Sequence, residues 1–152
     1  MISSLENTAG PAPSGDPAPA TQAPRVSRVL VVDDEIGVRA LVSAVIESMG
    51  YRAQAVSNGE EAVQAYQSHL EENDGGVCLV IMDLALPGGM SGLETTDALR
   101  QMDPSVRVIA SSGYLQQNAR TAAIERGFAG ILPKPFTAER MTSELRWVIS
   151  RL

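Results

Sequence analysis

The chain has 152 residues, of which 44% are hydrophobic, and this size and composition suit one folded domain with a buried core and some additional chain. Asp and Glu number 18 against 12 for Lys and Arg, and the formal net charge of -6 argues against direct binding of nucleic acid by this chain. A single cysteine excludes an internal disulfide framework, and no apolar run reaches the roughly 20 residues of a membrane-spanning helix, so we predict a cytoplasmic protein.

Residues 1–25 differ in composition from the rest of the chain. Five of the nine prolines fall in this segment together with Ala, Ser, Thr and Gly, so it cannot bury enough apolar surface to offset the entropy of ordering. We predict a disordered Pro/Ala-rich tail or linker there and a folded domain over residues 26–152.

From residue 28 onward, short apolar runs alternate with segments whose apolar residues recur every three or four positions. The first run, Arg28 to Val32, predicts a buried strand that ends in the carboxylates of Asp33 and Asp34. An amphipathic helix follows and ends at Gly50. Capping of this helix is an alternative role for the two aspartates, because Asp is favoured at helix N-termini.

A second strand is expected at about 51–56 and a second helix from Asn58 onward. His69 lies on this helix, and we expect a solvated surface histidine because the chain has no second histidine with which to build a site. The positions expected to face the core in the first two helices are Val38, Leu41, Val42, Val45, Ile46, Met49, Ala62, Val63, Tyr66 and Leu70.

The stretch from Val77 to Asp83 is an apolar run that ends abruptly in one carboxylate. Such a run, bounded by turn signals, predicts a strand buried on both faces. Pro87 and two glycines follow, so the chain turns there and displays the carboxylate at the rim where open α/β sheets bind their ligands. We interpret Asp83 as a nucleophile that accepts a phosphoryl group.

The remaining elements continue the alternation. A fourth strand is expected over 106–111, followed by Ser112, and a weakly amphipathic, Ala-rich helix over about 116–126. A fifth strand over 127–132 is halted by prolines on both sides of Lys134. The positions expected to face the core in the third and last helices are Leu93, Thr96, Leu99, Met102, Met141, Leu145, Val148, Ile149 and Leu152.

A last helix, with Thr137 as its N-cap, completes five strands alternating with five helices. This order predicts the α/β class, with a doubly wound parallel sheet covered by helices on both faces. The carboxyl ends of parallel strands share one rim, so five polar side chains are expected to converge there, namely Asp33, Asp34, Asp83, Ser112 and Lys134.

Three carboxylates in one crevice repel one another and must take up protons or bind a cation. An all-oxygen site with one open side suits Mg²⁺. With the metal and Lys134 present the crevice is roughly neutral and can receive a phosphoryl group, whose oxygens would be bound by the cation, the lysine and the hydroxyl of Ser112.

These residues resemble the receiver domain of two-component response regulators over about Arg28 to Leu152. The resemblance implies a flavodoxin-like sheet of five strands in the order 2-1-3-4-5 with five helices. It rests on four spaced motifs in the family's order: Val31-Val32-Asp33-Asp34-Glu35, Met82-Asp83-Leu84-Ala85-Leu86-Pro87, Ser111-Ser112-Gly113-Tyr114 and Leu132-Pro133-Lys134-Pro135-Phe136.

The resemblance also implies roles for these residues. Asp83 would be phosphorylated by a phosphohistidine of a sensor histidine kinase or phosphotransfer protein, with Ser112 and Lys134 binding phosphoryl oxygens. The Lys134-Pro135 peptide bond would be cis. The protein would signal to a downstream protein partner as a monomer or weak homodimer, and would catalyse at most its own phosphorylation and dephosphorylation. Asp34, Asp83 and the backbone carbonyl of Ala85 would hold Mg²⁺, and Asp33 would assist through a water molecule.

Two features depart from the family's usual pattern. The loop Pro87 to Gly92 is one residue longer than the commonest form and resembles receivers fused to hybrid sensor kinases. Ile131 stands where the family usually has an aromatic residue that works as a switch together with the hydroxyl residue, here Ser112. We hypothesise that phosphorylation is transmitted mainly through the loops and the fourth helix, with a contribution from Tyr114.

Several alternatives stay open. The chain fits a free-standing receiver or the receiver module of a hybrid kinase with its linker. A receiver that binds partners without phosphorylation is a second alternative, against which the intact set of five residues argues. An aspartate-nucleophile phosphatase of the haloacid dehalogenase type is disfavoured, because Ala85 stands where such an enzyme has its general acid.

Overall fold

The computed structural model describes residues 27–72, 77–113 and 119–152. The predictions for the tail over 1–25, for Tyr114 and for the first turn of the fourth helix therefore lie outside the described residues. No helix within these three ranges is both long and apolar enough to cross a lipid bilayer.

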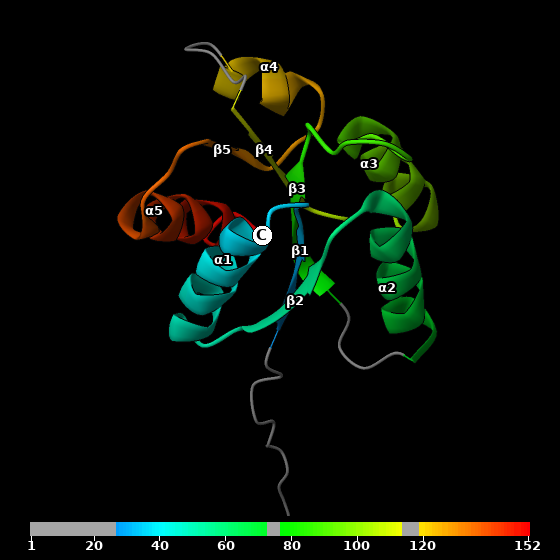
Figure 1. Cartoon of the computed structure of the whole chain (residues 1–152), viewed down its shortest axis with the longest axis horizontal. Coiled ribbons are helices and arrows are strands. Elements are labelled where there is room, and N and C mark those ends of the chain that lie inside the picture. Colours follow the sequence, from blue (N-terminus) through cyan, green and yellow to red (C-terminus); the bar gives the residue numbers. More distant parts are fainter. Residues whose placement is uncertain (1–26, 73–76, 114–118) are drawn as a thin grey trace, which may run out of the picture.

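Strands and helices alternate along the chain (Figure 1). The strands are β1 (Arg28–Val32), β2 (Arg52–Val56), β3 (Val77–Asp83), β4 (Val108–Ser112) and β5 (Gly130–Pro133). The helices are α1 (Ile36–Ser48), α2 (Gly59–Glu72), α3 (Gly92–Met102), α4 (Ala119–Glu125) and α5 (Ala138–Ile149).

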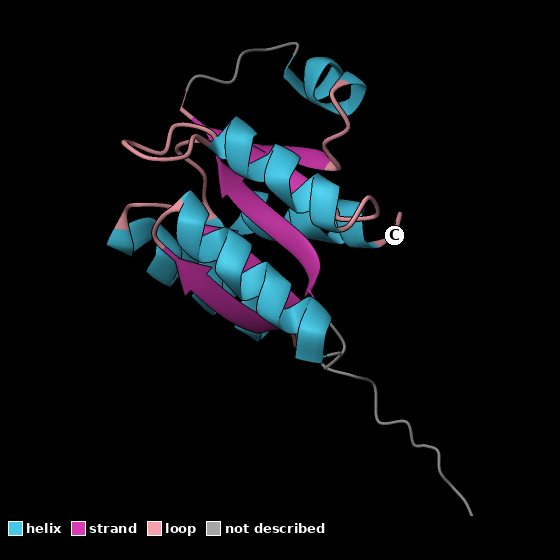
Figure 2. Ribbon diagram, turned by 90° about the vertical axis from the view of Figure 1, so that its right-hand side faces the viewer, coloured by secondary structure: helices cyan, strands magenta, loops and turns pink. Residues whose placement is uncertain are grey.

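The strands form one parallel sheet in the order β2-β1-β3-β4-β5, which confirms the predicted doubly wound topology. Helices α1 and α5 cover one face, whereas α2 and α3 cover the other (Figure 1). Figure 2 shows the strands lying between helices in front and behind. All strand ends that carry the predicted site therefore point to the same rim.

The core consists of two clusters, one on each face of the sheet. Along β1, Val29 and Val31 pack against α1 and α5, while Leu30 and Val32 pack towards α2, α3 and α4. All four side chains are at most 1% exposed. A strand buried on both faces needs a continuous apolar run, which is why the sequence pattern identified the central strands.

Four leucines predicted to face the core are exposed instead. Three of them lie beside the buried stripe of a helix: α3 buries Thr95, Thr96 and Leu99, so the neighbouring Leu93 faces outward. The fourth, Leu152, lies beyond the carboxyl end of α5. A helix buries only one stripe, and the sequence alone does not fix its centre to within one residue. The exposed residues are Leu41, Leu70, Leu93 and Leu152.

The prediction for His69 is wrong, because its side chain is buried with 7% exposure. Its Nε2 atom lies 2.6 Å from Oε1 of Gln54 on β2, and its ring also hydrogen bonds with the guanidinium of Arg28 on β1. Partners from two strands satisfy the imidazole, so burial costs little.

The ends of two strands differ from the prediction. β4 extends to Ser112, and β5 begins at Gly130 rather than at Gly127. Gly127 has a φ of 88° and follows α4, where glycine commonly ends a helix. The predicted N-cap at Thr137 is confirmed, since its side chain accepts a hydrogen bond from the Arg140 N–H at 3.1 Å.

Candidate functional site

The candidate site lies at the carboxyl ends of β1, β3, β4 and β5 (Figure 1). Asp33 directly follows β1, Asp83 is the last residue of β3, and Ser112 is the last residue of β4. Lys134 directly follows β5. Sheet topology alone therefore brings residues that are up to 101 positions apart to one rim.

Three of the predicted residues form an acidic cluster. Asp33, Asp34 and Asp83 each offer a carboxylate oxygen, and these oxygens lie within 4.8 Å of one another. Asp33 and Asp83 are buried whereas Asp34 is exposed, so the cluster is open on one side. Hard oxygen donors around an accessible position fit Mg²⁺, which keeps several waters and binds few protein carboxylates.

The side chain of Lys134 is the cationic partner of this cluster. Its Nζ atom lies 2.8 Å from Oδ2 of Asp33, 3.3 Å from Oδ2 of Asp83 and 3.7 Å from Oε1 of Glu35. Burial alone would lower the pKa of Lys134, but hydrogen bonds and charge interactions with the two aspartates raise it. The lysine therefore remains charged and offsets part of the repulsion between the carboxylates.

The pKa of Asp83 is raised above its usual value, mainly because burial disfavours the ionised carboxyl group. The charge of Asp33 adds to the increase. A hydrogen bond from the Ala85 N–H to Oδ1, at 2.9 Å, and the interactions with Lys134 oppose it. The Ala85 N–H therefore holds Oδ1 of Asp83 while Lys134 holds Oδ2, so the orientation of the carboxylate is fixed.

Two residues outside the predicted set hold Asp33 in place. Its Oδ1 atom accepts a hydrogen bond from the Glu35 N–H at 2.9 Å, and its backbone carbonyl accepts one from Nη1 of Arg39 at 2.9 Å. The N-cap of α1 is Glu35, which makes no side-chain capping bond. The alternative that Asp33 or Asp34 is merely the helix cap is therefore wrong.

Ser112 and Lys134 are linked through the backbone. The Lys134 N–H donates to the carbonyl of Ser112 at 3.0 Å, and the Ser112 side chain is almost fully buried. The peptide bond between Lys134 and Pro135 is cis, as the resemblance implied. Ile131 is buried three residues before Lys134, in the core cluster on the α2 and α3 face.

The carboxyl-terminal part of the longer loop after β3 is attached to α2 and leads directly into α3. Oε2 of Glu60 on α2 accepts a hydrogen bond from the Met90 N–H at 3.1 Å, beside Gly89, whose φ is 42°. Ser91 and Glu94 form a reciprocal capping box that begins α3. The spacing of this serine and glutamate is a signal in the sequence that could have predicted where the helix starts.

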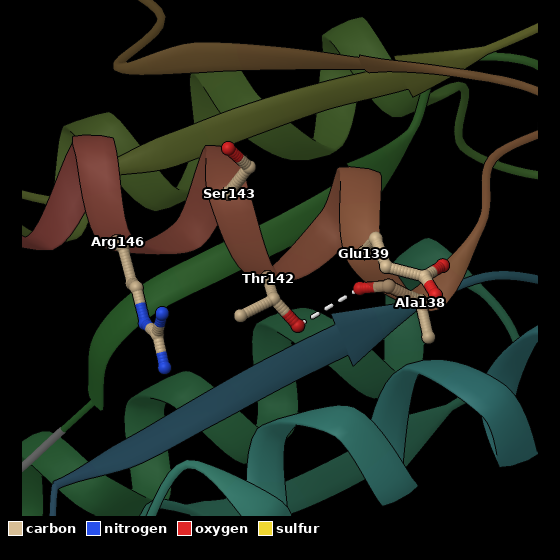
Figure 3. A pocket seen from close by; sticks show the side chains of 5 residues that line it. All are labelled: Ala138, Glu139, Thr142, Ser143 and Arg146. Atoms are coloured by element: carbon tan, nitrogen blue, oxygen red, sulfur yellow. Dashed lines mark hydrogen bonds between the residues drawn. The ribbon is translucent and has the colours of Figure 1, made fainter.

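A separate surface depression lies along α5 and is lined by that helix alone (Figure 3). Thr142 Oγ1 donates a hydrogen bond to the carbonyl of Ala138 at 2.8 Å. The other lining residues are Glu139, Ser143 and Arg146. This depression does not gather charged groups from several elements as the strand-end rim does, so the rim remains the candidate site.

Comparison with known protein families gives a match to the response regulator receiver domain over residues 29–146. The chemotaxis protein CheY of Bacillus subtilis is 31% identical over 115 residues, covering 75% of this chain and 90% of that protein. The sensor histidine kinase GacS of Pseudomonas protegens is 32% identical over 133 residues, covering 84% of this chain and 14% of the kinase. The solved structure of chemotaxis protein CheY4 of Vibrio cholerae has a TM-score of 0.69 at 26% identity, covering 81% of this chain and 98% of that one.

Proposed function

Because the chain belongs to the response regulator receiver domain family of two-component systems, we propose that Asp83 accepts a phosphoryl group from a phosphohistidine. The donor is a sensor histidine kinase or a histidine phosphotransfer protein. The observation that carries this proposal is the contact of Lys134 with both Asp33 and Asp83 beside an open cluster of three carboxylates. The cluster attracts a cation, and the lysine supports an incoming anion.

In the proposed reaction, a carboxylate oxygen of Asp83 attacks the phosphorus atom. The bond from phosphorus to the donor's imidazole nitrogen breaks, the imidazole keeps that electron pair, and an acyl phosphate forms on Asp83. The Ala85 N–H holds Oδ1 of Asp83 at 2.9 Å, which limits rotation of the carboxylate during attack. In this proposal, Lys134 would bind one phosphoryl oxygen, and the hydroxyl of Ser112 would donate a hydrogen bond to another.

The donor set for Mg²⁺ would be Asp33, Asp34, Asp83 and the carbonyl of Ala85. When bound, the ion neutralises charge on the phosphoryl oxygens. We propose that the phosphorylated protein signals by contact with a downstream protein and catalyses only its own phosphorylation and dephosphorylation.

The test is the intact mass of the full chain after incubation with acetyl phosphate, with and without Mg²⁺. We expect a gain of one phosphoryl group that requires Mg²⁺ and is lost in Asp83→Asn. Asp97→Asn is the matched control, because Asp97 is an exposed aspartate on α3 outside the acidic cluster. A Mg²⁺-dependent adduct that persists in Asp83→Asn would overturn the assignment, and no adduct on the wild-type chain would favour a receiver that works without phosphorylation.

A further inference from the structure

Arg120 on α4 and Glu144 on α5 form an ion pair that the proposed chemistry does not use, and the glutamate of this pair is buried while the arginine is partly exposed. Nη2 of Arg120 lies 2.6 Å from Oε1 of Glu144, and Nη1 lies 3.1 Å from Oε2, so the contact is bidentate. The Glu144 side chain is only 4% exposed. A buried carboxylate is costly unless it is paired, so this contact is a defined structural feature rather than a chance surface pair.

The same carboxylate also binds strand β5. Oε2 of Glu144 accepts a hydrogen bond from the backbone N–H of Ile131 at 2.9 Å. β5 is an edge strand, and the outward backbone groups of an edge strand have no neighbouring strand to bind. Glu144 therefore takes the place of a strand partner. We call Arg120, Glu144 and the Ile131 N–H the edge latch.

The edge latch joins elements from both faces of the sheet. Glu144 belongs to α5, which packs against the face covered by α1, whereas α4 contributes Ala123 to the core on the opposite face. Ala123 is the one buried residue of this seven-residue helix. With so little apolar burial, the attachment of α4 depends strongly on its polar contact with Glu144.

β5 connects the latch directly to the phosphorylation site. Ile131 precedes Lys134 by three residues, and Lys134 pairs with Asp33 and Asp83. A change in the partners of Lys134 therefore acts on β5, and Glu144 is bound to β5 through the Ile131 N–H. Ile131 has no aromatic ring that could report this change at the surface.

We propose that the edge latch couples the Asp83 site to α4: it is closed while Lys134 pairs with Asp33 and Asp83, and it is released when Asp83 is phosphorylated. The proposal rests on the proposed function and adds the element that transmits the signal. If the latch stabilises the unphosphorylated state, it must weaken the binding of any ligand that favours the phosphorylated state, because the two equilibria are linked. Removing the latch should therefore tighten binding of a phosphoryl analogue.

The chain carries its own reporter, because Trp147 is its single tryptophan. The guanidinium carbon of Arg120 lies 4.6 Å from the centre of the Trp147 ring, and that of Arg151 lies 4.7 Å from it. Release of the latch withdraws Arg120 from the ring and changes the fluorescence of Trp147. Arg151→Gln is the matched control, since Arg151 contacts the same ring from outside the latch.

The experiment titrates the full chain with beryllofluoride in Mg²⁺ and follows Trp147 fluorescence together with the amide resonances of Ala85 and Ser112. In the wild-type chain and in Arg151→Gln, we expect the fluorescence to change at the concentration that shifts the amides. In Arg120→Gln, the fluorescence response should vanish and half-saturation should fall about fivefold. In Arg120→Gln, the buried carboxylate of Glu144 loses its cationic partner, and this loss alone can prevent folding. The double variant Arg120→Gln/Glu144→Gln removes this charge as well, and we expect it to give the same two results as Arg120→Gln.

The outcomes separate this proposal from the proposed function. Amide shifts without a fluorescence change in the wild-type chain would overturn the latch and leave Asp83 as the acceptor. Unchanged or weaker beryllofluoride binding in the latch variants would also overturn it. If the amides of Ala85 and Ser112 do not shift in the wild-type chain, the proposed function fails and the latch proposal fails with it.

Discussion

The ammonium group of Lys134 lies 2.8 Å from the carboxylate of Asp33, and the two side chains are 18% and 4% exposed. This contact neutralises a carboxylate that the fold has removed from water. The pKa of Lys134 is raised in the folded state, since its aspartate partners outweigh burial. Its contribution to stability is therefore complete below the unfolded pKa of about 10.4 and is lost as the pH rises through the folded pKa.

Lys134→Ala should destabilise the protein at pH 7 because it leaves Asp33 and Asp83 without their cation. We expect a loss of about 1 to 3 kcal/mol in the free energy of unfolding, measured with urea in the absence of Mg²⁺. Added Mg²⁺ should restore part of the loss, because a cation in the cluster replaces the missing charge. Arg140→Ala, which removes an exposed cation from α5, should change stability by less than about 0.5 kcal/mol. Equal losses in the two variants would contradict this account.

Asp83→Asn should raise the melting temperature at neutral pH without Mg²⁺. The pKa of Asp83 is raised mainly by burial, so its ionised form is less stable in the folded protein than in the unfolded chain. The penalty is complete above the folded pKa and absent below the unfolded pKa of about 4. The advantage of the variant should therefore shrink as the pH is lowered from 7 to 3, as followed by thermal melting. An advantage that is independent of pH would argue against ionisation as its cause.

The central strands could be predicted because they depend on local patterns, and the parallel order of the strands then predicted that the residues at their ends lie together. A strand covered on two faces must be continuously apolar, and its end is marked where a charged residue such as Asp83 follows. The positions of His69 and Glu144 could not be predicted in this way. Both side chains are buried and satisfied by polar partners from distant elements, namely Gln54 for the histidine and Arg120 for the glutamate. A search for helix periodicity that counts only apolar residues does not find such positions.

Tyr66→Phe should cost about 1 kcal/mol at pH 7, because the Tyr66 hydroxyl donates to Oδ2 of Asp103 at 2.7 Å. Hydrogen bonds from the side chains of Ser105 and Tyr66 lower the pKa of Asp103. A lowered folded pKa stabilises the protein above the unfolded value of about 4 and loses this effect as the pH falls. The cost of Tyr66→Phe, measured by urea unfolding, should therefore be smaller at pH 3. In an Asp103→Asn background, the cost of Tyr66→Phe should depend less on pH. If Tyr66→Phe costs the same at pH 7 and pH 3 in the wild-type background, the ionised carboxylate of Asp103 is not the origin of the cost.

Two glycine substitutions should have opposite effects. A Cβ at Gly92, the first residue of α3, would overlap the carbonyl oxygen of Asp83 and lie 2.7 Å from the Cα of Leu84. Both are backbone atoms of the loop that begins at the site, so Gly92→Ala should cost about 2 to 3 kcal/mol and shift the amide resonance of Ala85. A Cβ at Gly37 on α1 meets nothing within 4 Å, and Gly37→Ala should gain about 0.5 kcal/mol through helix propensity. Urea unfolding of both variants checks the difference, and a neutral Gly92→Ala would mean that the loop relaxes freely beside Asp83.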